Sequence, residues 1–164
     1  MLKMTLAALA CFGAVGCSTV IIPVQLPDQN GARQVRTLPA DQVSDLGFHS
    51  SINSQRQANG LPPLAPSGQL FQAARLHAVD MATRDYFDHV SPDGSRAADR
   101  AARQGVPACG IGENIAFGQK SSAAVFDAWM GSRGHRANIL NPRMRSYGLA
   151  REGNIWVLVL YAPC

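Results

Sequence analysis

Hydrophobic residues recur at helical spacing in four segments of the chain. Phe48 and Ile52 are four residues apart, and Asn59-Gly60 follows them as a stop signal, which predicts a helix over residues 45–58. The other three segments begin near a serine that can cap a helix, and each keeps apolar residues close together on one side. These three helices are expected from Ser67 onward, from Ser95 to Gly105, and from Ser121-Ser122 to Gly131.

The C-terminal segment has a different pattern, because both sets of alternating positions are hydrophobic over residues 154–161. A strand of this kind must be covered on both faces. Residues 144–151 are expected to pair with it antiparallel through a turn at Glu152-Gly153, and residues 112–118 form a third candidate strand. Helices on both sides of these strands predict an α+β fold, a three-layer α-β-α sandwich around a small, mainly antiparallel sheet.

The N-terminal segment is typical of a secretory signal. Lys3 precedes an uncharged run of 13 residues, which as a helix spans about 20 Å and falls short of the roughly 30 Å hydrocarbon core of a bilayer. The run ends in AVGC, which resembles the bacterial lipobox. We therefore expect residues 1–16 to be a lipoprotein-type signal peptide and Cys17 to be the site of lipidation. The alternative is an ordinary secretory signal with an incidental cysteine.

Residues 17–44 keep neither a helical nor a strand period and contain three prolines and one glycine. We interpret them as a flexible tether whose ends lie roughly 30 Å apart on average. The globular domain is then expected over residues 45–164. Together these features predict an exported protein, either anchored in the cell envelope (outer membrane or periplasm) or secreted, with the lipid anchor as its contact with the membrane.

The composition narrows the possible partners. With 46% hydrophobic residues among 164, the chain can bury a core. The net charge of +4 comes from scattered arginines and aromatic residues make up only 7%, whereas a nucleic-acid surface needs a basic stripe. We therefore expect no nucleic-acid partner. Nothing in the sequence indicates an obligate interface, so a monomer is expected, and the well-marked motifs of serine hydrolases, zinc proteases and P-loop proteins are absent.

Two cysteines lie in the expected globular domain, Cys109 and Cys164. An exported protein folds in an oxidising compartment, so a disulfide between them is expected. On the chain-entropy model, a loop of this length is worth on the order of 4 kcal/mol. The alternative is a pair of free thiols.

Three polar segments carry the candidate chemistry. His89 stands at the edge of a turn-rich loop, Glu113 lies among apolar neighbours on the third candidate strand, and His135 follows Gly134 in a polar stretch. A buried carboxylate needs a partner or a ligand. Two imidazoles and one carboxylate that converge would form either a metal site or an acid–base site. Spacing alone does not bring them together, and a lone His or Glu is more often structural.

Three motifs, in this order, resemble the CAP superfamily, which includes the cysteine-rich secretory proteins, insect venom allergens and plant pathogenesis-related proteins. They are DHVSPDG, GENIAFG and WMGSRGHRANILNP, and the best match is the bacterial SCP-like extracellular branch. The resemblance covers residues 46–161 and implies an α-β-α sandwich with a shallow cleft lined by a His/Glu tetrad. His89, Glu113 and His135 match three members of that tetrad.

The fourth member of the tetrad is a glutamate three residues after a tryptophan, and here Ser132 stands at that position. Some family members bind a divalent cation such as zinc between the two histidines. The resemblance therefore implies a possible zinc site at His89 and His135 that lacks the second carboxylate.

Three further residues are candidates for supporting the cleft. Asn114 and Asn138 are expected to brace its loops by hydrogen bonds to backbone, although ordinary turn chemistry explains them equally well. Ser132 is interpreted as a replacement for a glutamate at a helix end rather than as a nucleophile. Of the remaining histidines, His77 is expected on the core side of its helix, and His49 is expected in solvent.

Three functions remain open at this point. In the first, a tethered domain binds a small ligand or an envelope component in the cleft: a lipid, a glycan, a peptide or a divalent metal. In the second, the cleft is a hydrolase in which His89 or His135 acts as general base or as ligand to a zinc-bound water, and Glu113 orients it. In the third, the protein is a non-catalytic envelope scaffold.

Overall fold

The computed structural model describes residues 40–107 and 109–164, with side chains described from residue 46. The elements are α1 (Ala40–Ala58), β1 (Ala65–Pro66), α2 (Gly68–Arg84), α3 (Ala97–Arg103), β2 (Gly110–Phe117), α4 (Ser122–Gly131), α5 (Arg133–Ile139), β3 (Ser146–Glu152) and β4 (Ile155–Ala162). The predicted signal peptide, the lipidation site Cys17 and the predicted tether up to residue 39 lie outside the described residues. Within residues 40–107 and 109–164, no helix has the length and apolar character needed to cross a membrane.

The four strands form one sheet in the order β1-β3-β4-β2. The short strand β1 runs parallel to β3, and the pairs β3–β4 and β4–β2 are antiparallel. The predicted hairpin is present, with Gly153 at a positive φ of 55° in its turn. The third candidate strand, predicted over residues 112–118, is β2 at the edge of the sheet.

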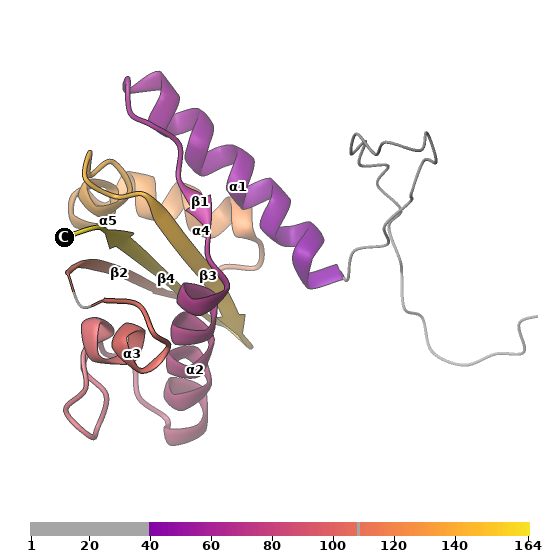
Figure 1. Cartoon of the computed structure of the whole chain (residues 1–164). Coiled ribbons are helices and arrows are strands. Elements are labelled where there is room, and N and C mark those ends of the chain that lie inside the picture. The colour runs from indigo at the N-terminus through magenta and orange to yellow at the C-terminus, as the bar shows by residue number, and fades with distance from the viewer. Residues whose placement is uncertain (1–39, 108) are drawn as a thin grey trace, which may run out of the picture. The chain divides into compact units, whose positions relative to one another are not determined.

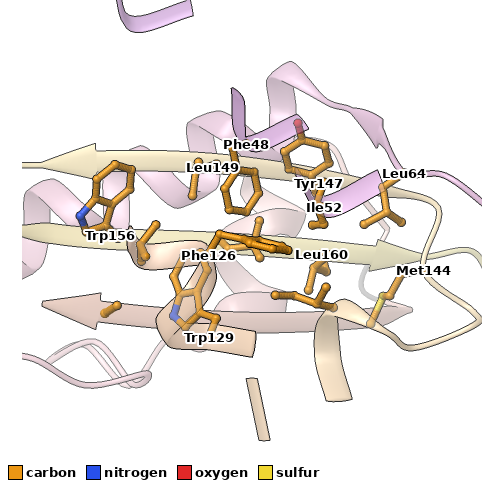
Figure 2. Packing of buried hydrophobic residues seen from close by; sticks show 14 of the residues in the cluster. Phe48, Ile52, Leu64, Phe126, Trp129, Met144, Tyr147, Leu149, Trp156 and Leu160 are labelled. Atoms are coloured by element: carbon orange, nitrogen blue, oxygen red, sulfur yellow. The ribbon is translucent and has the colours of Figure 1, made fainter. Parts of the chain in front are cut away.

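Side chains of the strand β4 belong to both hydrophobic cores, one on each face of the sheet. Trp156, Leu158 and Leu160 point to one face, where they pack with residues of α1, α4 and α5. Figure 2 shows this cluster, in which aromatic side chains from α1 and α4 gather against the sheet. Val157 and Val159 point to the other face, against α2 and α3. The three-layer α-β-α sandwich is therefore confirmed (Figure 1).

Local capping explains where α2, α3 and α4 begin. The side chains of Ser67 and Ser121 accept hydrogen bonds from the first turns of α2 and α4, as predicted. The third helix begins one residue later than expected, because Asp99 Oδ2 accepts from the backbone N–H of Arg96 at 2.9 Å and makes Arg96 the cap.

The structure also adds two elements to the prediction. A fifth helix, α5, spans part of the segment interpreted as polar, and β1 adds two residues to the sheet. In addition, α1 begins at Ala40, five residues before the predicted start of the domain.

The disulfide predicted between Cys109 and Cys164 is present, with 5.2 Å between the two Cα atoms. It joins the residue before β2 to the C-terminal residue after β4, and these two strands are already paired over their whole length. The bond therefore links the chain just before the edge strand β2 to the chain just after β4, at the same end of the sheet.

Candidate functional site

The site is built around Glu113 on the edge strand β2. Glu113 lies opposite Val159, and both side chains are on the face covered by α2 and α3. Only 4% of its side chain is exposed. A carboxylate buried this deeply requires partners, and the sequence indicated as much because Glu113 stands among apolar neighbours.

Two cationic or ionisable side chains hold the two oxygens of this carboxylate. His89, from the loop between α2 and α3, places its Nδ1 atom 2.9 Å from Oε1. Arg100, from α3, donates from Nη2 to Oε2 at 2.8 Å. Glu113 is therefore bound from both sides, while 52% of the His89 side chain remains exposed.

Arg100 is the site residue that the sequence analysis missed. It is buried and donates to the side chain of Ser91 and to the carbonyl oxygens of Ser95 and His89, at 2.9 to 3.1 Å. The same guanidinium therefore fixes the loop that carries His89 and neutralises Glu113. The sequence of α3, AADRAAR, does not distinguish the buried Arg100 from the exposed Arg103, because the tertiary fold determines which of the two enters the core.

His77 lies on the buried side of the site, next to Glu113. It is fully buried on α2, and its Nε2 atom lies 3.0 Å from the carbonyl oxygen of Asp88 and 3.9 Å from Glu113 Oε1. Its expected place on the core side of its helix is confirmed. Burial lowers the pKa of His77, although the charge of Glu113 acts in the opposite direction.

The pKa of Glu113 reflects a competition between burial and its partners. Burial by itself would raise this pKa, but the hydrogen bond from His89 and the charge of Arg100 overcome that effect and hold it below its usual value. The same hydrogen bond raises the pKa of His89 above that of a free imidazole, against a smaller opposing effect of burial. The site therefore combines an ionised carboxylate with an imidazole that retains its proton more readily than usual.

His135 lies on α5, on the opposite side of β2 from α3. Two asparagines attach α5 to the strand: Asn114 donates to the carbonyl oxygen of His135 at 3.1 Å, and Asn138 donates to the carbonyl oxygen of Glu113 at 3.2 Å. Asn138 also donates to Asn114 Oδ1 at 2.8 Å. The two asparagines thus make hydrogen bonds to backbone that join α5 to β2, and their support of a ligand cleft stays a prediction.

Burial and the charge of His89, in the cluster around Glu113, both affect the pKa of His135. Burial lowers the pKa of His135, and the charge of His89 lowers it further. The environments of the two histidines therefore shift their pKa values in opposite directions. Ser132 is the single residue between α4 and α5, which is consistent with its interpretation as a helix-end position. Its backbone N–H donates to Trp129.

A hollow of about 370 Å³ opens over the cluster and is lined by His89, Arg96, Ala97 and Glu113. Of the three residues predicted to line a cleft, His89 and Glu113 border this hollow and His135 does not. His89 contributes its exposed imidazole edge, and Arg96 adds a positive charge at the rim.

The donor set does not fit a zinc site. A catalytic zinc ion takes three protein ligands, and within residues 40–107 and 109–164 no three His, Cys, Asp or Glu side chains are arranged to hold one. The carboxylate of Glu113 is already neutralised by Arg100, and Nδ1 of His89 is engaged by that carboxylate. The role of His89 and His135 as zinc ligands stays a prediction that this geometry does not support.

Proteins of related sequence come from Bacillus subtilis strain 168. The chain is 42% identical over 106 residues to an uncharacterized protein, YkwD, covering 63% of this chain and 41% of YkwD. It is 31% identical over 109 residues to an uncharacterized membrane protein, YlbC, covering 66% of this chain and 30% of YlbC. The chain therefore spans less than half the length of the curated relatives that it matches.

Solved structures show the same fold. An extracellular protein of Bacillus anthracis that contains an SCP domain superposes with a TM-score of 0.71 at 27% identity, over 80% of this chain and 47% of that one. An outer surface protein of Borrelia burgdorferi superposes with a TM-score of 0.66 at 19% identity, over 73% of this chain and 92% of that one. The second likeness concerns the fold alone.

The family model described as CAP, the cysteine-rich secretory protein family, matches residues 49–156. This match extends from α1 into β4 and contains the whole cluster around Glu113. The fold class agrees with that of the SCP-domain structure. The chain therefore belongs to the CAP family of cysteine-rich secretory proteins.

Proposed function

We propose that this protein is an exported CAP domain that binds a ligand carrying an anionic group, with the exposed imidazole of His89 as the recognition element. The observation that supports the proposal most directly is the 2.9 Å contact between His89 Nδ1 and the buried Glu113. That contact fixes the ring and its tautomer, and it leaves Nε2 available to a ligand.

The charge of the site favours an anionic partner. The hydrogen bond from Glu113 raises the pKa of His89, so a larger fraction of this imidazole is protonated near neutral pH than of a free one. Arg96 lines the same hollow. A protonated imidazole beside a guanidinium recognises a carboxylate or a phosphate by charge-assisted hydrogen bonds. Peptide carboxylates, acidic glycans and phospholipid headgroups all present such a group.

Export is part of the proposal and is supported by the N-terminal pattern. The uncharged run that ends at Cys17 is typical of a lipoprotein signal. The structural neighbours include proteins described as extracellular and as an outer surface protein. Replacing Cys17 by Ser in the expressed chain tests the anchor: we expect the protein to move from the membrane fraction to the soluble fraction. An unchanged membrane fraction would rule out lipidation at Cys17.

The ring nitrogens of His89 provide a direct test of ligand binding. We would record nitrogen-detected NMR spectra of the ¹⁵N-histidine-labelled protein with three probes: soluble peptidoglycan fragments, short-chain phosphatidylglycerol, and neutral chitotriose. We expect an anionic probe to shift the Nε2 signal of His89 and to leave His49, which is bonded to Tyr147, unchanged. Chitotriose is the uncharged control. If no anionic probe shifts His89, or if all three shift it equally, the proposal fails.

A second function is favoured by one specific observation, the opposite pKa shifts of His89 and His135. Paired groups whose environments separate their pKa values can act as acid and base. In this alternative, protonated His89 is the general acid, neutral His135 is the general base, and Glu113 orients His89. Turnover of a peptide or cell-wall substrate that Glu113→Gln abolishes, with the fold intact, would establish it. A scaffold role would be favoured if binding and turnover were the same in every cleft variant.

A further inference from the structure

The sheet has a second edge, which the site at Glu113 does not use. The strand β1 pairs only with Ser146 and Tyr147 of β3. In the part of the chain that the structure describes, residues 148–152 of β3 have β4 on one side and no strand on the other. A strand edge without a partner strand is a template for pairing with another chain. Along this edge Arg151 and Glu152 are exposed, and Leu149 is 6% exposed.

The direction of the backbone groups along this edge follows from one hydrogen bond. The N–H of Ser67 donates to the carbonyl oxygen of Tyr147 at 2.8 Å, so this carbonyl points away from β4. Successive residues of an antiparallel strand alternate between its two neighbours. Leu149 and Arg151 therefore direct their N–H and C=O groups outward, whereas Gly148 and Ala150 direct theirs toward β4.

A groove runs along this edge. It has a volume of about 680 Å³, its floor is β3, and its walls are the first turns of α2 and the loop before α4. Phe71 lies on one wall and Trp156 on the other. The guanidinium of Arg151 sits 4.9 Å from the centre of the Trp156 ring and donates to the carbonyl oxygen of Lys120, which holds this side chain along the groove.

The charge of the groove is positive. Three exposed basic side chains line it, Arg75, Lys120 and Arg151, against one carboxylate, Glu152. Both α2 and α4 begin in its walls, so the positive ends of two helix dipoles add to this field. A partner that lies in the groove therefore gains from negative charge.

We propose that an extended, acidic segment of a partner protein adds a strand to the outer edge of β3. The segment bonds to the outward backbone groups of Leu149 and Arg151 and directs its carboxylates to the three basic side chains. This is strand addition, in which main-chain hydrogen bonds supply affinity and side chains supply specificity. The surface lies at the opposite edge of the sheet from β2, and it is therefore distinct from the cleft at His89.

The first test uses a defined peptide probe on the purified full chain. The probe is a fluorescein-labelled hexapeptide of alternating Asp and Val, measured by fluorescence anisotropy at low salt and at 0.5 M NaCl. An alternating Lys-Val peptide controls for charge, and the Asp-Val sequence N-methylated at every residue lacks all the N–H groups that strand pairing needs. We expect the Asp-Val peptide to bind more tightly than either control, and its binding to weaken with salt. Equal binding of the N-methylated peptide would overturn the proposal.

Variants at one position separate charge from backbone pairing. Arg151→Ala removes the charge and is expected to weaken binding by about 2- to 5-fold. Arg151→Pro also removes the outward N–H and is expected to weaken binding by about a further 10-fold. Equal affinities of the two variants would contradict strand addition. His89→Ala removes the anion site proposed in the cleft, and in that variant the preference for the Asp-Val peptide over its N-methylated form should persist, so that this proposal can fail or succeed independently of the cleft.

Amide hydrogen exchange gives a readout that does not depend on any variant. In the free chain, the amides of Gly148 and Ala150 should be protected by β4, and those of Leu149 and Arg151 should exchange faster. Addition of the Asp-Val peptide should protect the second pair. If Leu149 and Arg151 are already protected in the free chain, this edge is covered by the chain itself or by a second copy, and the proposed partner segment is excluded.

Discussion

The contact between Arg100 and Glu113 offers the sharpest test of how the site is built. The two side chains are 8% and 4% exposed, and the guanidinium donates to the carboxylate at 2.8 Å. Removing one partner of a buried pair leaves an uncompensated charge and typically costs about 3–5 kcal/mol. We therefore expect Arg100→Met to lower the free energy of unfolding by that amount at pH 7. The methionine fills much of the same space, so the loss reflects charge and hydrogen bonds more than a cavity.

The pH dependence of this loss identifies its cause. In the native protein the pKa of Glu113 is lowered, so its contribution to stability is present above the pKa of the unfolded chain and is lost as pH falls through the folded pKa. In Arg100→Met, burial is expected to dominate and to raise the pKa of Glu113. The variant should then lose stability as pH rises from about 4 to 7. The difference between the two proteins should therefore be largest at neutral pH and smaller at acid pH, where only the hydrogen bonds of Arg100 to Ser91, Ser95 and His89 are still lost.

Urea unfolding followed by tryptophan fluorescence measures this difference, with the disulfide kept oxidised in every sample. Arg103→Met is the matched control on the same helix, since Arg103 and its partner Asp93 are 60% and 50% exposed at a separation of 3.5 Å. An exposed pair of this kind is worth about 0–1 kcal/mol. If Arg100→Met costs no more than Arg103→Met, or if its cost does not change with pH, the ion pair does not hold the site together.

Three further outcomes follow from the same structure. Glu113→Gln removes the carboxylate that raises the pKa of His89, so an NMR titration should show that pKa moving down, and an unchanged value would contradict the contact. Gly148→Ala should prevent stable packing of α2, because an added Cβ would overlap the backbone of that helix; a thermal melting curve like that of the native protein would refute this. Reduction of the bond between Cys109 and Cys164, which are 55 residues apart, should lower the free energy of unfolding by up to about 4 kcal/mol; thiol labelling of the unreduced protein should find neither cysteine free.

The sequence predicts the fold well where local chemistry and periodicity agree. Ser67 and Ser121 are good caps in front of apolar stripes, and both cap helices in the structure. A strand that is apolar on both faces has to lie between two layers, and β4 does so. The helix α5 was missed because Ile139 is its only buried residue, which is too little for a helical period to be visible.

The site could be predicted only in part. Glu113 was identifiable because a carboxylate among apolar residues needs a partner, and the family resemblance suggested His89. Arg100 was not identifiable from either argument, because its contact with Glu113 spans 13 residues and depends on how the loop between α2 and α3 folds back. Local patterns determine which residues are buried, but tertiary contacts determine which of them meet.

The two edges of the sheet differ in whether side chains of the same chain bond to their outward backbone groups. This difference determines where a partner strand can bind. Along β2, side chains from the helices satisfy two outward carbonyl groups: Trp129 Nε1 donates to the carbonyl oxygen of Ile115, and Asn138 donates to that of Glu113. This edge is thereby closed to strand pairing and is used to position the cleft. Along β3, the outward groups beyond β1 face the basic groove. The two surfaces share the buried strand β4, in which Val159 lies between β2 and β3, and the helix α2, which carries His77 at the site and Phe71 at the groove. Two sites are coupled only when each ligand favours the same one of two states of the elements between them. Both proposed ligands use groups that already face outward, so binding at one edge should leave the affinity at the other unchanged.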